Sequence, residues 1–200
     1  MTSAVELETN IATVLLRPCK VTDLSSLLEI YREGFREEIA FFFRRFSRSF
    51  FEAVFRLLIE DTIVAEVSDN VVGFIIPVLG VTPMLRTGVV RVVLTLPALL
   101  LSVRSSFFIY IMQKLRNTEW GGGQLGIGCI GVKAEYRGRG IGGLLMREVL
   151  TRYPARNMVL EVRPWNRSAL RLYTGAGFRE TGAWRDPLGE WVVMSRTALL

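Results

Sequence analysis

The stretch Tyr136-Arg137-Gly138-Arg139-Gly140-Ile141-Gly142-Gly143 lies between a predicted strand over residues 125–132 and a predicted helix over residues 141–152. Glycine lets a backbone approach a ligand closely and adopt positive φ values. Free N–H groups at the start of the following helix, together with the helix dipole, attract an anion. Two arginines add forked positive charge at the same place. The stretch predicts a site for a diphosphate-bearing cofactor, and a plain glycine-rich turn with two solvated arginines is the alternative.

Two well-known phosphate-binding loops share parts of this pattern. The Walker A loop is excluded because no Lys-Ser or Lys-Thr follows the last glycine. The dinucleotide fingerprint G-x-G-x-x-G is matched by Gly138, Gly140 and Gly143, and Glu161 follows near the place of a ribose-binding acid. Only 57 residues follow Gly143, and they end in a predicted hairpin rather than in further alternating strands and helices. Glu161 also lies inside its predicted strand instead of at the strand tip.

A third interpretation explains more residues. The pattern Arg137-x-x-Gly140-x-Gly142 resembles the acetyl-CoA pyrophosphate signature of the GNAT superfamily of N-acetyltransferases. A downstream block resembles that of the ribosomal-protein N-terminal alanine acetyltransferases, and it reads Leu160-Glu161-Val162-Arg163-Pro164-Trp165-Asn166-Arg167-Ser168-Ala169-Leu170-Arg171-Leu172-Tyr173, then Gly177-Phe178. Two motifs in this order are far more specific than one glycine-rich loop, and the resemblance extends over most of the chain.

The resemblance implies a mixed α/β (α+β) fold in which flanking helices cover a central, mostly antiparallel sheet. A splayed pair of strands, here residues 127–132 and 158–162, would admit acetyl-CoA as acyl donor. Its pantetheine would pair with backbone groups at Ile130 and Val132, and its pyrophosphate would meet the amides of residues 137–142. Asn166 matches a pantetheine contact, and a helix N-cap would also explain it. The predicted cofactor-binding residues are Ile130, Gly131, Val132, Arg137, Gly138, Arg139, Gly140, Ile141, Gly142, Gly143, Asn166 and Tyr173.

The same resemblance implies direct transfer of an acetyl group to a primary amine in a ternary complex. Tyr173 matches the general acid that protonates the leaving thiolate, since a phenol pKa near 10 is close to that of a thiol. Glu161 matches a carboxylate base that removes a proton from the ammonium form of the acceptor. A buried core tyrosine and a paired structural carboxylate are the respective alternatives. The chain has no histidine, so histidine-dependent triads and His-ligated zinc are excluded, and no metal site is expected.

The remaining pattern predicts one domain over residues 1–200. Before the glycine-rich stretch we expect a strand over 13–16, a helix capped by Thr22, a helical stretch over 39–60 and a hairpin of residues 63–67 and 71–78. From residue 125 onward the order β-α-β-α-β-β is expected, with strands over 158–162, 178–182 and 190–195.

Two segments depart from the family pattern. Residues 80–120 are apolar nearly all round and are expected to form a helical insertion, as a lid or a homodimer face over the acceptor cleft. The terminal hairpin, Trp184–Trp191, lacks the Tyr-Tyr…Glu-Asp pattern of peptide-selective relatives. Both segments border the acceptor site in this fold, so the ribosomal-protein substrate does not carry over. A protein N-terminus, a lysine, a polyamine, an amino sugar and an antibiotic amine stay open as acceptors.

Composition narrows the class of protein further. Half of the 200 residues are hydrophobic, which excludes a disordered chain. The net charge is +6, and 22 of the 25 basic residues are arginine. These arginines do not form a basic stripe interleaved with aromatics outside residues 41–50, so no nucleic acid is expected. The uncharged runs at 71–85 and 92–103 are shorter than the roughly 20 residues of a membrane-spanning helix.

Location and turnover complete the expectations. Cys19 and Cys129 are too few for a disulfide scaffold, and we expect free thiols in a reducing cytoplasm. No secretory signal is visible in Met1–Asn10. The rival to an enzyme is an acyl-CoA-binding regulatory or interaction module that has lost turnover.

Overall fold

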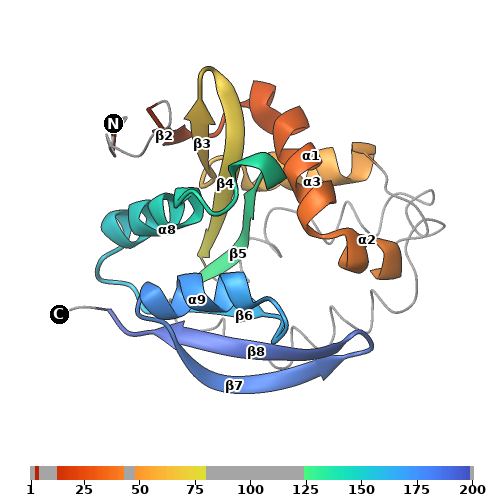
Figure 1. Ribbon diagram of the computed structural model, residues 1–200, viewed down its shortest axis with the longest axis vertical. Helices are drawn as coiled ribbons and strands as arrows, with labels where there is room; N and C mark the ends of the chain where they lie inside the picture. Colours follow the sequence, from red (N-terminus) through yellow and green to blue (C-terminus); the bar gives the residue numbers. More distant parts are fainter. Residues whose placement is uncertain (1–2, 5–12, 43–47, 80–123, 199–200) are drawn as a thin grey trace.

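The computed structural model describes residues 3–4, 13–42, 48–79 and 124–198. Within them, an eight-stranded mixed sheet has the strand order β1-β2-β3-β4-β5-β6-β8-β7 (Figure 1). Adjacent strands are antiparallel except β5 and β6, which are parallel. The strands are β1 (Ser3–Ala4), β2 (Leu15–Pro18), β3 (Ile63–Val67), β4 (Asn70–Leu79), β5 (Leu125–Val132), β6 (Met158–Val162), β7 (Arg179–Asp186) and β8 (Gly189–Arg196). This arrangement confirms the predicted fold class.

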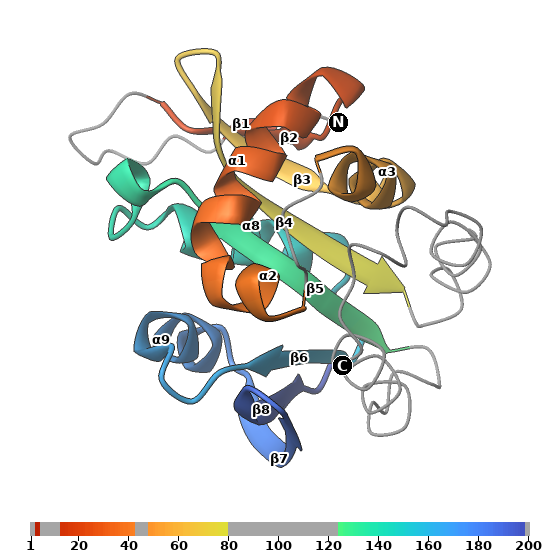
Figure 2. The same ribbon diagram turned by 90° about the vertical axis from the view of Figure 1, so that its right-hand side faces the viewer.

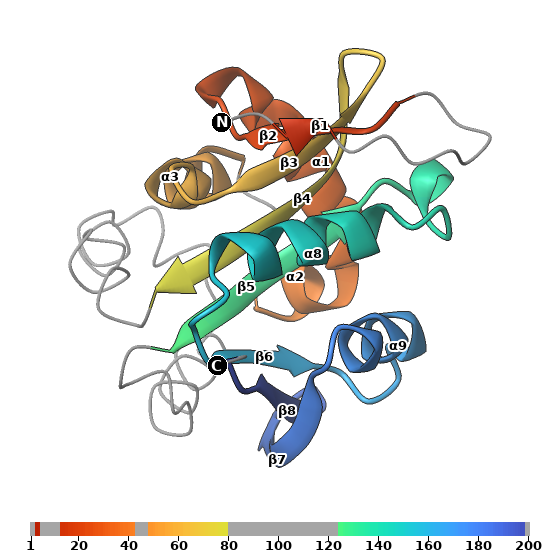
Figure 3. The ribbon, with the colours of Figure 1, turned by 90° about the vertical axis from the view of Figure 1, so that its left-hand side faces the viewer.

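Helices cover both faces of the sheet. Figure 2 shows the face under α1 (Leu24–Gly34), α2 (Arg36–Phe42) and α3 (Arg48–Leu58), where one apolar cluster lies. Figure 3 shows the opposite face, where α8 (Ile141–Arg152) packs on the sheet with α9 (Arg167–Gly175) beside it. Each cluster buries one set of alternating strand residues, as the two-residue period of a strand requires. The sheet therefore lies between the two apolar clusters.

The C-terminal half follows the sequence prediction closely. The predicted bounds of β5, α8 and β6 agree with the structure, and the expected order β-α-β-α-β-β is confirmed. The last two strands are longer than predicted, because their pairing continues to a tight turn between Asp186 and Gly189. The predicted insertion over residues 80–120 lies outside the described residues.

The N-terminal half agrees in type and differs in bounds. The first predicted strand is shifted two residues toward the C-terminus, and the stretch 39–60 corresponds to α2 and α3. Thr22 does not cap the helix. It lies in a short 3₁₀ helix (Val21–Asp23), and the Asp23 carboxylate accepts the Lys20 N–H at 2.7 Å. The Arg17 guanidinium holds the same carboxylate, which fixes the start of α1.

Gly131 sets how closely α1 approaches the sheet. A methyl group at this position would lie 2.8 Å from Ile30 Cγ2 and 3.0 Å from Phe74 Cε1. Because these neighbours are fully buried, we expect Gly131→Ala to lower the free energy of unfolding by about 1–3 kcal/mol through overpacking. Urea denaturation measures the change. Gly182→Ala on β7, where a methyl group meets nothing within 4 Å, is the control and is expected to be neutral. Equal unfolding free energies for the two variants would contradict the packing argument.

Candidate active site

The parallel strands β5 and β6 separate halfway along their length. They pair at Leu125–Met158, Gly126–Val159 and Ile127–Leu160, and no later pair joins them. Beyond this point β5 stays paired with β4, and β6 stays paired with β8. The β4–β5 register shifts between Ile76 and Pro77, which leaves Gly128 as an extra residue. A bulge of this kind bends and twists a strand, so it diverts β5 away from β6 at the point where pairing ends.

The backbone groups that β5 presents to this gap follow from its register. The Lys133 N–H donates to the Val72 carbonyl on β4 at 2.8 Å. Because successive residues of a strand face opposite edges, Val132 and Ile130 present their backbone groups to the gap. Gly131 faces β4 instead and packs beneath Ile30. Of the three cofactor-binding residues predicted on this strand, Ile130 and Val132 therefore direct their backbone groups toward the gap. Gly131 directs its backbone groups toward β4.

The loop after β5 leads directly into the start of α8. A 3₁₀ turn (Ala134–Tyr136) precedes it, and Gly138 and Gly140 adopt φ values of 74° and 83°. The Leu144 N–H makes the first bond of α8 to the Gly140 carbonyl, so the N–H groups of residues 141–143 precede the hydrogen-bonded ladder. No side chain of the described residues caps them. A methyl group at Gly138, Gly140 or Gly143 would meet nothing within 4 Å. These amides form an open cradle that fits a phosphate group.

The two arginines of the loop have different places. The Arg137 Nε donates to the Val132 carbonyl at 2.9 Å, and its NH2 lies 3.6 Å from Glu33 Oε1 on α1. Arg137 thus ties the loop to the end of β5. Arg139 is exposed, with its guanidinium 5.4 Å from the Tyr136 ring centre.

Tyr173 lies on the α8–α9 side of the gap. Its side chain is 6% exposed and packs in the cluster beneath α8, with its ring centre 6.2 Å from that of Phe178. Within the described residues its hydroxyl makes no hydrogen bond. Burial, with a smaller contribution from the nearby Cys129 thiol, raises the pKa of Tyr173. The phenol is therefore protonated throughout the neutral range, and its proton is held more firmly than that of an exposed tyrosine.

Glu161 lies on the opposite face. It follows Leu160 on β6, whose side chain faces α8, so alternation directs Glu161 toward α1–α3. Its Oε1 accepts the Trp184 indole N–H at 3.2 Å, and Trp184 stacks on Trp191 with ring centres 6.0 Å apart. A carboxylate on one face and a phenol on the other thus flank the diverging strands.

Asn166 is the N-cap of α9. Its Oδ1 accepts the Ala169 N–H at 3.1 Å and the Ser168 hydroxyl at 3.0 Å. The cap role is confirmed, and the amide nitrogen stays oriented by these bonds. Asn166 is exposed beside the carboxyl end of β6, which leaves the predicted pantetheine contact sterically open.

A buried ionic cluster lies next to Glu161, and the sequence analysis assigned it no role. Arg163 is 4% exposed and donates two hydrogen bonds to Asp186, at 3.1 and 2.8 Å. Its guanidinium carbon lies 3.8 Å from the Trp191 ring centre, and its Nε lies 3.9 Å from Glu38 Oε1 on α2. Burial raises the pKa of Glu38, although the Arg163 charge opposes that shift. The cluster clamps the β7–β8 hairpin to β6 and α2.

A signal for this cluster was present in the sequence. Arg163 stood inside the quoted motif, two residues after Glu161 and directly after the end of β6, where continued alternation places it on the same face. Its partner Asp186 is distant in sequence and is indistinguishable from any turn aspartate before Pro187. The pairing of β6 with β8, together with that of β8 with β7, brings the two together.

Three further features of the described residues concern the cysteines, metal-ligating groups and membrane-spanning helices. Both cysteines are free thiols. No group of three or more metal-ligating side chains occurs in the described part of the chain. None of the described helices has the length and apolar character that crossing a membrane demands.

Comparison with known protein families identifies the family of this chain. The family model described as "Acetyltransferase (GNAT) family" matches residues 24–178, a range that includes the gap, the amide cradle, Glu161 and Tyr173. The chain belongs to the GNAT family. Membership confirms the family predicted from the two motifs, together with the enzyme class, an N-acetyltransferase.

Known proteins resemble this GNAT protein in a short segment of sequence and in fold. A segment of 53 residues is 47% identical to the N-alpha-acetyltransferase RimI of Mycobacterium tuberculosis, covering 26% of this chain and 34% of that protein. The match thus spans about a third of the length of the curated relative. Among solved structures, Ard1 of Thermoplasma volcanium has a TM-score of 0.61 at 20% identity, covering 94% of this chain and 99% of the other. Arabidopsis thaliana Naa50, solved with a bisubstrate analogue, has a TM-score of 0.58 at 20% identity, covering 92% and 98%.

Proposed function

We propose that this GNAT protein transfers an acetyl group from acetyl-CoA to a primary amine, directly and within a ternary complex. The observation that carries the proposal is the divergence of β5 and β6 beside the uncapped amides of α8. The cradle fits a diphosphate, because amides at a helix start bind anions and a Cβ at Gly138, Gly140 or Gly143 would meet nothing within 4 Å. The free edge of β5 at Ile130 and Val132 fits an extended amide-bearing arm.

Residues on the two faces divide the proton transfers between them. Acetyl-CoA, when bound, supplies a thioester carbonyl for attack by the amine. Glu161 accepts the proton that the acceptor ammonium must lose before its nitrogen can form a bond to carbon. As the carbon–sulfur bond breaks, Tyr173 donates its proton to sulfur from the opposite face. The nitrogen, now bonded to the carbonyl carbon, gives up its second proton to solvent as the amide forms. Solvent also restores the proton of Tyr173 and takes the one on Glu161, so that one proton is released for each acetyl group transferred.

The acceptor enters, in this proposal, from the face of α1, α2 and the β7–β8 hairpin. Glu161 faces that side, and Trp184 fixes one of its oxygens. The RimI segment and the peptide-based analogue bound to Naa50 make a protein N-terminal amine the first acceptor to test. The hairpin here carries two stacked tryptophans, so we expect a side-chain preference different from that of those relatives.

A charge reversal in the cradle tests cofactor binding. We expect Gly143→Asp to weaken acetyl-CoA binding at least about 100-fold, because a carboxylate would face the diphosphate among the amides that bind it. Gly143→Asn places a neutral group of the same size at the same open position and is expected to weaken binding less than about tenfold. Calorimetric titration measures both affinities, and equal losses for the two variants would contradict a diphosphate at this position.

Turnover requires a second measurement. Thiol release is followed with a panel containing a peptide N-terminus, a lysine side chain, a polyamine and an amino sugar. Release of CoA with one class names the acceptor. Cofactor binding without release from any amine would instead support the regulatory module. Failure to bind acetyl-CoA would overturn the proposal as a whole.

A further inference from the structure

The side chain of Arg137 covers the end of the free edge of β5. Its Nε donates a hydrogen bond of 2.9 Å to the Val132 carbonyl. The next residue, Lys133, directs its N–H to the Val72 carbonyl on β4. Because successive residues of a strand direct their backbone groups to opposite edges, the Val132 carbonyl points away from β4 and toward the gap. Arg137 therefore occupies a backbone acceptor at the edge where the proposed cofactor lies.

The same guanidinium is also tied to α1. Its NH2 lies 3.6 Å from Glu33 Oε1. Helix α1 packs closely over β5 because Gly131 leaves room for Ile30 (Figure 2). Glu33 follows Ile30 by three residues, which places it on the same side of the helix. The Arg137 and Glu33 side chains are 50% and 30% exposed. A solvated ion pair of this kind is weak, so Arg137 is held in a place that it can leave.

A bound acetyl-CoA would compete for this arginine. Its diphosphate, on the amides of residues 141–143, would bring negative charge to the loop that carries Arg137. Hydrogen bonds between arginine and phosphate are charge-assisted and frequently bidentate. By contrast, the Val132 carbonyl is neutral, and the Glu33 carboxylate lies beyond hydrogen-bond distance. The extended arm of the cofactor would also pair with backbone groups of β5 at the edge where Arg137 lies. Both effects favour a different position of the Arg137 side chain once the cofactor is bound.

We propose that Arg137 exchanges partners when acetyl-CoA binds, leaving Glu33 and the Val132 carbonyl and joining the diphosphate. This inference rests on the proposed function and adds to it a residue of α1 that controls cofactor affinity. In the free protein Glu33 competes with the cofactor for Arg137, and it takes the arginine back as CoA leaves. Glu33 is therefore a positioning residue, which weakens the binding of acetyl-CoA and of CoA alike and favours product release.

The test is a double-mutant cycle on the affinity for acetyl-CoA, measured by calorimetric titration at constant ionic strength. We expect Glu33→Gln to tighten binding about twofold to fivefold, because it removes a competing partner of modest strength. Arg137→Gln is expected to weaken binding at least about fivefold through the loss of a charge-assisted contact. In the Arg137→Gln background, Glu33→Gln is expected to change the affinity less than about 1.5-fold, because no arginine is left to compete for. A second series with CoA is expected to give the same changes.

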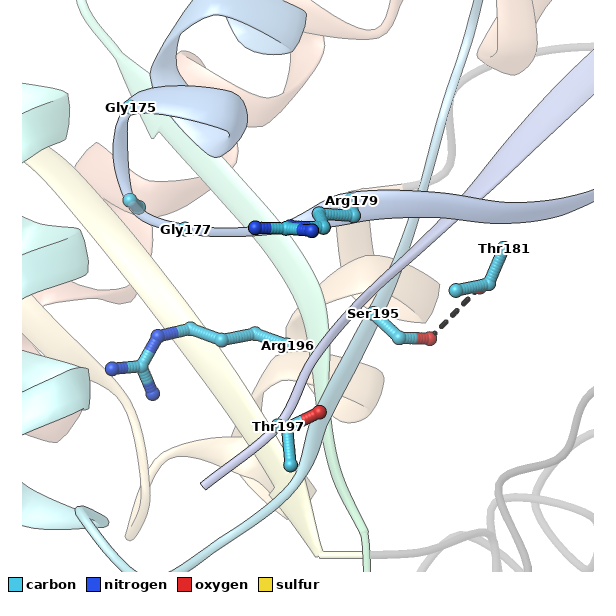
Figure 4. Close-up of a pocket in the computed structure, with 8 residues that line it drawn as sticks. Gly175, Gly177, Arg179, Thr181, Ser195, Arg196 and Thr197 are labelled. Carbon is cyan, nitrogen blue, oxygen red and sulfur yellow. Dashed lines mark hydrogen bonds between the residues drawn. The ribbon is translucent and has the colours of Figure 1, made fainter. Parts of the chain in front are cut away.

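Two control variants separate this exchange from a general effect of charge. Glu135→Gln removes an exposed carboxylate of the same loop and is expected to change the affinity less than about 1.5-fold, because exposed charges are screened by salt. Arg179→Gln removes an exposed arginine of β7, in the hollow after α9 that Figure 4 shows, and is expected to leave the affinity unchanged. All four side chains are exposed or half-exposed, so these variants are expected to fold.

Three outcomes would overturn the inference while acetyl-CoA still binds. A Glu33→Gln protein that binds no more tightly than the parent would show that Glu33 does not compete for Arg137. A gain of equal size in the Arg137→Gln background, or in Glu135→Gln, would assign the change to the removal of negative charge in general. An Arg137→Gln protein with the affinity of the parent would show that Arg137 does not join the diphosphate. A parent protein that does not bind acetyl-CoA would instead overturn the proposed function, and this inference with it.

Discussion

Replacing Tyr173 with phenylalanine is expected to lower kcat about 100-fold, the usual contribution of a positioned general acid. The affinity for acetyl-CoA and the free energy of unfolding should change little. The ring keeps its packing against Phe178, and the lost hydroxyl has no hydrogen-bond partner among the described residues that would be left unpaired. Steady-state thiol release gives kcat, and calorimetry gives the affinity.

Tyr153→Phe is the matched control for this variant. Tyr153 is half-buried, follows α8 and also has its pKa raised by burial, but it lies at the far end of that helix from the cradle. Its loss is expected to leave kcat unchanged. A Tyr173→Phe enzyme with kcat within about twofold of the parent would assign Tyr173 to the core alone, which is the alternative reading of its burial.

The pKa of Tyr173 also fixes the sign of a pH effect. Because burial raises it, the acid form is complete at neutral pH and is lost only as the pH rises past the raised value. We expect that deprotonation of Tyr173 lowers kcat only at a pH well above about 10, which is the ordinary pKa of a phenol. The raised pKa also makes the phenol a weaker acid, so the driving force for proton transfer to sulfur is smaller. The similarity of phenol and thiol pKa values, which the sequence analysis used, therefore does not support Tyr173 as the general acid. Its position across the gap from Glu161 supports that role instead.

Local patterns explain why so much of the C-terminal half could be predicted. Ile141–Arg152 begins after a glycine turn and repeats apolar residues at helical spacing, so both its type and its bounds were readable. The N-cap role of Asn166 could also be predicted, because it depends only on residues next to it in the sequence. Gly131 was different. Its motif position suggested a cofactor contact, while its backbone direction depends on the register with β4, which one strand alone does not encode.

Long-range contacts explain what could not be predicted. Asp186 and Arg163 are separated by 23 residues, and no local pattern links them. The Trp184 bond to Glu161 also depends on the β6–β8–β7 order. Sequence reasoning could therefore find the candidate base and acid, and only the fold shows that they lie on opposite faces of the sheet.

Arg163→Met is expected to lower the free energy of unfolding by about 3–5 kcal/mol, the usual cost of breaking one side of a buried ion pair. The Asp186 side chain is 0% exposed and would lose its charge partner, although the Trp191 and Leu188 N–H groups would still donate to it. Methionine fills much of the volume, so the loss reports charge more than packing. Chemical denaturation measures it.

Two further variants separate charge from position. Arg185→Met removes an exposed arginine of the same hairpin, paired with Glu190 at 79% and 40% side-chain exposure, and should cost less than about 1 kcal/mol. The double variant Arg163→Met/Asp186→Leu removes both buried charges and should recover part of the lost stability. If Arg163→Met were no less stable than Arg185→Met, the cluster would not be the clamp that holds the hairpin.

The clamp also predicts which kinetic constant suffers. Arg163 touches the hairpin and α2, which border the acceptor face, and none of its hydrogen bonds or ion pairs within the described residues reaches the loop of residues 136–143. In the folded fraction of Arg163→Met we expect the acceptor KM to rise at least about tenfold, while acetyl-CoA affinity stays within about threefold. Arg163→Lys keeps the charge but loses the bidentate fork, and it should restore part of the stability and less of the acceptor KM. An unchanged acceptor KM would show that the cluster stabilises the hairpin without shaping the site where the amine binds.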